Sequence, residues 1–380
     1  MPSSESDILD QAEAALRACL ERVPFIALRS IEREPRPDGP DLGLRLRVSR
    51  GSRRLIVEVR SSGQPRVIRE AINQLARYRD RPRGGYAVVV APYISPRAGQ
   101  LCVGENVGFV DLAGNCRLCF DQVFIEQTGR TNPEVKRRDL RSLYSPKASR
   151  VLRVLLDQPR RAWQLQQLAK EAQVSLGLAS NVKKLLTDRE WIGTVTSTRT
   201  GAKATMATRT GTRTGTRTSA ATNVETEGLR LLDPAALLGE WAASYSFRKN
   251  QLVDCYTLRD VAEAEAGLAE ECSKRGWSYA LTGFSGAARL VPAVRYQRAM
   301  AYVGGPPEEL LGPLQLKVVE SGANVSLLVP YDEGVFQGAR RLDDIDVVSP
   351  VQLYLDLRSF RGRGEEAAEQ ILEEVIKPTW

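Results

Sequence analysis

Two short runs near the N-terminus alternate between apolar and polar residues, as half-buried β-strands do. They cover residues 41–48 and 53–60 and are separated by a short turn. If Leu46 pairs with Leu55, one face of the hairpin is entirely apolar and consists of Leu42, Leu44, Leu46, Val48, Leu55, Val57 and Val59. The opposite face carries the charged side chains of Asp41, Glu58 and Arg60. The pattern predicts a hairpin with one buried face and one charged face.

The segments around this hairpin alternate between helical and strand periods. Residues 5–22 have apolar residues at helical spacing, and a second helix contains Gln74 and Tyr78. Residues 86–91 are a continuous apolar run, typical of a strand buried on both faces, and further strands are predicted at 107–112 and 117–120. The order predicts a mixed α/β domain over residues 1–128.

The charged face of the hairpin has the composition of a cation site. In the predicted register Asp41 lies almost opposite Arg60 and diagonal to Glu58, close enough for the two carboxylates to hold one divalent cation. Gln74 and Tyr78 are four residues apart and therefore share one face of their helix.

These residues make the segment from about 30 to 127 similar to the PD-(D/E)xK (restriction endonuclease-like) nucleases, and its Gln-x-x-x-Tyr element resembles the RecB-type branch. The resemblance implies that Asp41 and Glu58 bind Mg²⁺ or Mn²⁺ and that Gln74 and Tyr78 position the substrate strand. It implies a lysine at position 60, where this chain has Arg60. A guanidinium stays protonated, whereas an ammonium can shift its pKa and help to activate water.

Three interpretations of this site stay open. In the first, Glu58 and Arg60 are only a solvated cross-strand charge pair. In the second, the domain is a degenerate nuclease fold that binds DNA. In the third, it is an active metal-dependent endonuclease.

Residues 142–232 have the pattern of a winged helix-turn-helix. One helix starts at Ser145 and stops before Pro159, a second covers 165–172 and a third covers 178–189. Strand-like segments follow at 191–195 and 228–232, as in a wing. In such a domain the third helix enters the major groove, and the polar residues available to phosphates and base edges are Ser175, Ser180, Asn181, Lys183 and Lys184. The alternative is a small helical domain that packs against a neighbour.

A tract of Thr, Arg and Gly without acidic residues separates the two wing strands at 196–223. Such a composition cannot bury a core, so we expect this insertion to be disordered. The simpler interpretation is a neutral repeat expansion at a tolerant loop tip. The functional one is a cationic arm that binds phosphates through Arg199, Arg209, Arg213 and Arg217.

Residues 233–380 predict an α+β domain. Helices are expected from Asp233 and over 260–275, and strands at 252–258 and 325–329. The segments 277–290 and 344–357 resemble the AbiEi family, and the resemblance extends back to residue 145. It implies a transcriptional regulator of the antitoxin type from type IV toxin–antitoxin systems.

Composition excludes several classes of site. The chain has no histidine, which removes Ser-His and Cys-His nucleophile pairs and nearly all catalytic zinc designs. Its six cysteines are scattered through apolar patterns, which is typical of reduced core residues rather than of a disulfide framework. There is neither a long apolar run nor a signal-like N-terminus, so we expect a cytoplasmic protein without a membrane span.

Charge is distributed unevenly along the chain. Residues 1–150 hold 26 basic and 18 acidic residues, residues 151–227 hold 12 and 6, and residues 228–380 hold 16 and 22. The first 227 residues therefore carry +14, as expected where a protein faces a polyanion.

The leading hypothesis is a DNA-binding transcriptional regulator that is not an enzyme. We expect it to bind double-stranded DNA as a homodimer and to offer its acidic C-terminal domain to a protein partner. The alternatives are a metal-dependent endonuclease, with Mg²⁺ or Mn²⁺ on Asp41 and Glu58, and an interaction protein whose helix-turn-helix binds other proteins.

Overall fold

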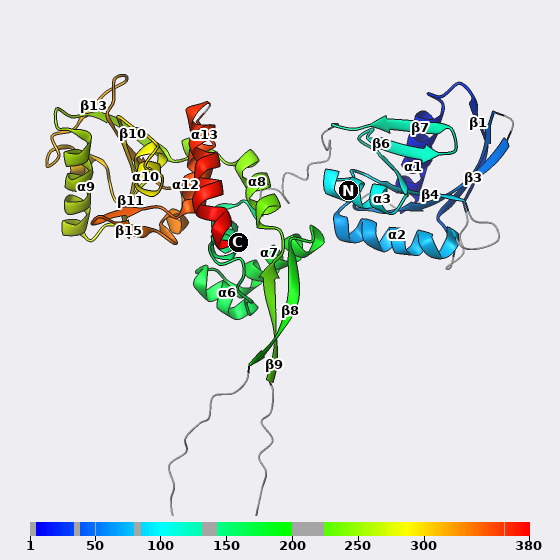
Figure 1. Cartoon of the computed structure of the whole chain (residues 1–380), viewed down its shortest axis with the longest axis horizontal. Helices are drawn as coiled ribbons and strands as arrows, with labels where there is room; N and C mark the ends of the chain where they lie inside the picture. Colours follow the sequence, from blue (N-terminus) through cyan, green and yellow to red (C-terminus); the bar gives the residue numbers. More distant parts are fainter. Residues whose placement is uncertain are drawn as a thin grey trace, which may run out of the picture. The chain divides into compact units, whose positions relative to one another are not determined.

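The computed structural model describes residues 5–33, 39–49, 51–79, 85–130, 143–199, 224–360 and 362–380. The chain folds as two compact units (Figure 1). Unit 1 comprises residues 1–140 with 185–190, and unit 2 comprises residues 141–184 with 191–380. No helix in the described ranges has the length and apolar character that a bilayer crossing requires.

Unit 1 contains a mixed seven-stranded sheet in the order β1-β2-β3-β4-β5-β6-β7. Strands β3, β4 and β5 are parallel neighbours, and the other neighbouring pairs are antiparallel. The elements are α1 (Glu5–Leu20), β1 (Ile26–Arg33), β2 (Leu42–Val48), β3 (Gly51–Val59), α2 (Pro65–Arg79), β4 (Tyr86–Ala91), α3 (Pro96–Gly104), β5 (Gly108–Asp111), β6 (Cys116–Phe120) and β7 (Val123–Gln127). The mixed α/β class predicted from the sequence is confirmed.

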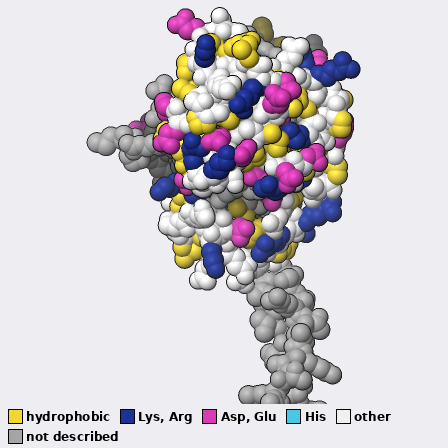
Figure 2. All heavy atoms as spheres, turned by 90° about the vertical axis from the view of Figure 1, so that its left-hand side faces the viewer, with side chains coloured by type: hydrophobic (Ala, Val, Ile, Leu, Met, Phe, Trp, Pro, Cys, Tyr) yellow, Lys and Arg dark blue, Asp and Glu magenta, His cyan; other side chains and the backbone are white. Residues whose placement is uncertain are grey.

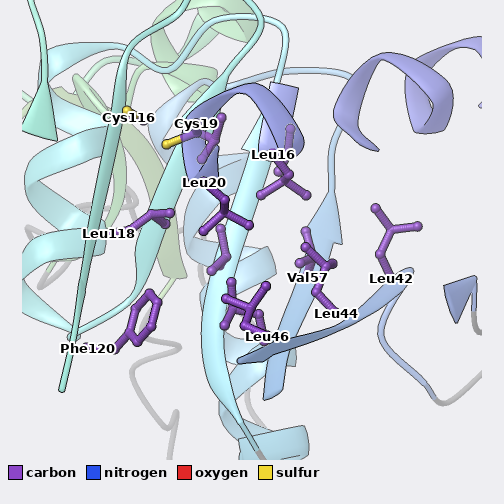
Figure 3. Close-up of a cluster of buried hydrophobic side chains, with 14 of the residues drawn as sticks. Leu16, Cys19, Leu20, Leu42, Leu44, Leu46, Val57, Cys116, Leu118 and Phe120 are labelled. Carbon is purple, nitrogen blue, oxygen red and sulfur yellow. The ribbon is translucent and has the colours of Figure 1, made fainter. Parts of the chain in front are cut away.

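Helices cover both faces of this sheet. Helix α1 buries Leu16, Cys19 and Leu20 against side chains of β2, β3 and β6 (Figure 3). Helices α2 and α3 bury a second apolar cluster against the opposite face, where β3, β4 and β5 contribute Ile56, Ala87, Val89, Ala91 and Phe109. Because β4 contributes to both clusters, its residues are a continuous apolar run rather than an alternating one.

The predicted register of the β2–β3 hairpin was wrong by two residues. Leu44, not Leu46, pairs with Leu55, and Val48 pairs with Gly51. Ser49, which follows the last paired residue of β2, has φ 50°. A shift of two residues leaves every side chain on its original face, so the alternation of apolar residues could not distinguish the two registers. Extending the observed register by one residue places Asp41 opposite Glu58 instead of Arg60.

Three helices and a two-stranded antiparallel sheet follow unit 1 in the sequence: α5 (Pro146–Asp157), α6 (Leu165–Glu171), α7 (Leu176–Asp188), β8 (Ile192–Arg199) and β9 (Val224–Leu231). They belong to unit 2 except for the last turn of α7, which starts at residue 185 and is grouped with unit 1. All five elements were predicted, but β8 extends to Arg199 and so includes residues that we assigned to the insertion. Arg209, Arg213 and Arg217 lie outside the described residues, and the side chain of Arg199 is also outside them.

The rest of unit 2 is built on a second mixed sheet, with the order β13-β10-β14-β12-β11-β16-β15. Its elements are α8 (Pro234–Ser244), η1 (Phe247–Lys249), β10 (Gln251–Tyr256), α9 (Val261–Arg275), β11 (Tyr279–Leu281), α10 (Gly283–Leu290), β12 (Ala299–Val303), α11 (Glu308–Leu311), β13 (Lys317–Val318), β14 (Val325–Val329), η2 (Glu333–Phe336), β15 (Arg340–Leu342), β16 (Ile345–Val347), α12 (Pro350–Leu357), α13 (Arg363–Gln370), η3 (Ile371–Ile376) and η4 (Lys377–Thr379).

Local sequence signals set the ends of these helices. The Asp233 side chain accepts a hydrogen bond from the N–H of Ala236 and caps α8, and Asp260 caps α9 in the same way through Glu263. Helix α9 ends at Gly276, whose φ of 67° is left-handed and favours glycine. The helix starts and the stop that we predicted at these residues are confirmed.

Candidate functional site

The two predicted carboxylates lie side by side on the α2 face of the unit 1 sheet. Asp41 directly precedes β2, and Glu58 is the penultimate residue of β3. The Asp41 Oδ2 accepts a hydrogen bond from the backbone N–H of Val59 at 2.7 Å, which fixes the carboxylate at the end of the hairpin. Glu58 is 0% exposed, whereas the Asp41 side chain is 37% exposed.

Arg60 extends into the space between these carboxylates. Its Nη1 lies 2.6 Å from Glu58 Oε2 and 3.5 Å from Asp41 Oδ2, and donates a hydrogen bond to the Val59 carbonyl at 3.0 Å. The distance to Glu58 is that of a close ion pair, but among the described residues neither Glu58 oxygen has a hydrogen bond of good geometry. The solvated cross-strand pair is therefore wrong for Glu58, because this carboxylate is completely buried.

Gln74 and Tyr78 continue the same polar chain on α2. Arg60 Nη2 donates to Gln74 Oε1 at 2.7 Å, and Gln74 Nε2 donates to the Tyr78 hydroxyl at 2.8 Å. The structure thus brings all five predicted residues of this site together. Gln74, which is itself bonded to Tyr78, holds the guanidinium from the helix side, and the Val59 carbonyl of β3 holds it from the sheet side.

The electrostatics of Glu58 follow from its burial. Burial raises the pKa of Glu58 to about 7, the adjacent Asp41 carboxylate adds to the rise, and Arg60 opposes it. Without Arg60 the site would hold two neighbouring carboxylates and no positive charge, an arrangement that strongly disfavours ionisation of both.

A divalent cation, as the nuclease resemblance implies, does not fit beside Arg60 in this arrangement. Mg²⁺ binds oxygen ligands at about 2.0–2.1 Å, and a cation shared by Asp41 and Glu58 would occupy the space that Arg60 Nη1 fills. Within the described ranges no group of three or more acidic or cysteine residues is arranged to hold a metal ion.

The second predicted site is the surface of α7. Ser175 directly precedes the helix, and its Oγ accepts a hydrogen bond from the N–H of Leu178 at 3.2 Å, so it caps the first turn. The side chains predicted to contact DNA are all exposed: Ser175, Ser180, Asn181, Lys183 and Lys184. The opposite face of α7 buries Ala179, Val182 and Leu186.

Two arginines on α5 were missed by the sequence reasoning. Arg150 forms a two-pronged ion pair with Asp332, at 2.8 Å from Nε to Oδ1 and 3.0 Å from Nη2 to Oδ2. Arg153 is 4% exposed and donates hydrogen bonds to Ser149 and Gln352. Both therefore join α5 to the segment after β9. Their signal was the presence of two arginines, three residues apart, among the regularly spaced apolar residues of this helix.

The Arg153 contact leads into a buried polar network around Asp356. Gln352, Tyr245, Tyr302 and Thr282 all donate hydrogen bonds to this carboxylate, at 2.9, 2.7, 3.0 and 2.5 Å. Burial raises the pKa of Asp356, although the four donors favour its charged form. The network joins α5, α8, α12 and the second sheet into one hydrogen-bonded core.

Comparison with known proteins identifies a family for the last part of the chain. Residues 230–377 match a family model described as transcriptional regulator, AbiEi antitoxin, type IV TA system. Neither the curated proteins nor the solved structures give a match. The AbiEi resemblance is thereby confirmed for residues 230–377, whereas its extension to residue 145 and the nuclease-like domain stay predictions.

Proposed function

We propose that this protein is a DNA-binding transcriptional regulator of the AbiEi antitoxin type. The single observation that carries the proposal is the match of residues 230–377 to that regulator family. We propose further that α5, α6, α7, β8 and β9 form a winged helix, which contacts double-stranded DNA through α7.

The surface of α7 supports this assignment. Gly177, Ser180, Asn181 and Lys184 fall on one face of the helix, at the spacing i, i+3, i+4 and i+7, and all four are exposed. Small and polar side chains at such positions allow close approach to base edges, while lysines bind phosphates without regard to sequence. The buried apolar face on the other side of α7 provides the rigid support that a recognition helix needs.

The firm attachment of α5 supports a role for the C-terminal part in regulation. Arg150 and Arg153 connect the first helix of the proposed DNA-binding domain to Asp332 and Gln352. A partner or a second subunit that binds residues 233–380 would therefore contact a part of the chain that is attached, through α5, to the proposed DNA-binding domain. Figure 2 shows one face of unit 2, where basic and acidic side chains are interspersed.

We propose that the acidic C-terminal part binds a protein partner or a second copy of the chain in a homodimer.

Unit 1 supports a second contact with DNA. Its antiparallel β2–β3 hairpin, followed by α2 and by β4 parallel to β3, is the arrangement expected of a restriction endonuclease-like domain. The basic residues of this unit would bind phosphates, and Arg60 favours binding over cleavage. The endonuclease alternative needs a cation between Asp41 and Glu58, in the space that the guanidinium takes. A cytoplasmic location and the absence of enzymatic activity belong to this proposal.

Selection from random duplexes tests the proposal with the full chain. Sequences retained by the wild type would be titrated by fluorescence anisotropy at several salt concentrations, together with a Lys183→Ala/Lys184→Ala variant. If these lysines bind phosphates, affinity falls for all sequences and the slope of log K against log salt becomes shallower by roughly 2.

Lys317→Ala is the matched control, because it removes an exposed charge from β13 in the same unit. It should leave the slope unchanged. Equal affinities and slopes for the α7 variant and the wild type would contradict DNA binding through α7.

A further inference from the structure

We propose that Arg60 is the resident cation of the Asp41–Glu58 site and that its guanidinium closes the site to divalent metals. This inference concerns unit 1 alone and does not depend on the proposed winged helix. It also bears on whether the nuclease-like domain is a degenerate fold that binds DNA or an active endonuclease, because it favours the degenerate fold.

The first step is the need of this site for positive charge. Glu58 is completely buried and next to a second carboxylate, Asp41. A buried carboxylate requires compensation by a proton, a metal ion or a cationic side chain. Arg60 provides the last of these, with Nη1 2.6 Å from Glu58 Oε2.

The second step is that the guanidinium is held in place at both ends. Nη1 contacts both carboxylates and the Val59 carbonyl, while Nη2 donates to Gln74 Oε1, which is itself part of a hydrogen-bonded pair with Tyr78. Only 22% of the Arg60 side chain is exposed. Displacing it would break all of these contacts and leave the Gln74 carbonyl without this donor.

The third step is competition for the same oxygens. A metal ion coordinated by Glu58 Oε2 and Asp41 Oδ2 would lie within bonding distance of oxygens that Arg60 Nη1 already approaches. A lysine ammonium in this place could lose its proton and with it its charge, whereas a guanidinium stays charged in proteins. The metal ion and the Arg60 guanidinium therefore exclude each other. Arg60 is part of the chain and so is always present at the site, whereas a metal ion must bind from solution.

A direct measurement of metal binding tests this inference without reference to DNA cleavage. Free Mn²⁺ would be followed by electron paramagnetic resonance during titration of four full-length proteins: the wild type, Glu58→Gln, Arg60→Ala and Arg60→Ala/Glu58→Gln. Arg45→Ala serves as the matched control, because it removes an exposed arginine from β2 that pairs with Glu32 rather than with the two carboxylates.

We expect no Glu58-dependent Mn²⁺ site in the wild type or in Arg45→Ala. Arg60→Ala should gain one such site, with an affinity on the order of a hundredfold above any Mn²⁺ binding of the wild type. The added Glu58→Gln should abolish it. A site in the wild type that disappears in Glu58→Gln would overturn the proposal, as would a folded Arg60→Ala protein that gains no site. If Arg60→Ala does not fold, Arg60→Gln provides a neutral side chain of similar reach, and the wild-type titration by itself still decides whether the site is closed.

Discussion

The ion pair between Arg150 and Asp332 should be an energetic link between α5 and the C-terminal part of unit 2. Its two hydrogen bonds, at 2.8 and 3.0 Å, have the parallel geometry of a strong guanidinium–carboxylate pair. The two side chains are only 14% and 10% exposed. Arg150→Met keeps the apolar stem of the arginine, and Asp332→Asn keeps the oxygen that accepts from the Gly334 N–H and caps η2.

The size of the link follows from this geometry. A hydrogen bond to a charged group contributes roughly 1.5–3 kcal/mol, and the small remaining exposure screens part of the attraction. We therefore expect a coupling free energy of about 2 kcal/mol from the double-mutant cycle. The exposed pair of Glu270 with Lys274 on α9 is screened by solvent and should give a much smaller coupling, which makes it the control cycle.

Urea unfolding followed by tryptophan fluorescence measures this coupling in the full chain. All five tryptophans belong to unit 2, so the signal reports on that unit: Trp163, Trp191, Trp241, Trp277 and Trp380. A coupling no larger than that of the Glu270–Lys274 control would refute the argument from burial and geometry.

The coupling should also depend on pH in a defined direction. Burial opposes ionisation of Asp332, but Arg150 and the Gly334 N–H outweigh it and lower the pKa of this carboxyl below 3.8. A group whose pKa is lowered in the folded state contributes stability above its unfolded pKa and loses it as pH falls toward the folded value. The coupling should therefore be complete at neutral pH and decrease as pH falls below 3.8.

Three further substitutions test the packing and the helix ends. Leu44→Ala should destabilise unit 1 by about 3 kcal/mol, because Leu44 is fully buried in the apolar cluster between α1 and the sheet. Unfolding followed by circular dichroism measures this loss, and an unchanged unfolding midpoint would argue against such a cluster. Gly276→Ala should cost unit 2 about 1 kcal/mol, because its φ of 67° is unfavourable for alanine, and equal fluorescence midpoints would contradict this. Ser175→Ala should cost about 1 kcal/mol through loss of the α7 cap, and the same fluorescence assay should show no such loss for Ser180→Ala, which removes an exposed hydroxyl from the same helix.

The sequence predicted the elements that have a strong period or a clear cap. The apolar face of the β2–β3 hairpin, the buried run of β4 and the three helices from α5 to α7 were all anticipated, because each buries one regular set of positions. Strands β1 and β7 were missed. Both lie at the edges of the unit 1 sheet, where partial exposure weakens the alternation.

The candidate site shows a different limit of sequence reasoning. The structure brings Asp41, Glu58, Arg60, Gln74 and Tyr78 together. Their arrangement depends on the hairpin register, which side-chain alternation leaves ambiguous by two residues. The roles of Arg150 and Arg153 depend on Asp332 and Gln352, which are roughly two hundred residues away in sequence. Such long-range partners are set by the tertiary fold, and no local pattern indicates them.

The central claim, that α7 reads DNA sequence, is tested most directly by the ratio of affinities for a selected duplex and a scrambled one. We would measure this ratio for the wild type, Ser180→Ala/Asn181→Ala and the exposed control Gln251→Ala. A base contact contributes roughly 1–3 kcal/mol of discrimination, so the ratio should fall at least about tenfold in the α7 variant. It should not change in the control. An undiminished ratio in the α7 variant would place sequence recognition elsewhere in the chain and contradict the account.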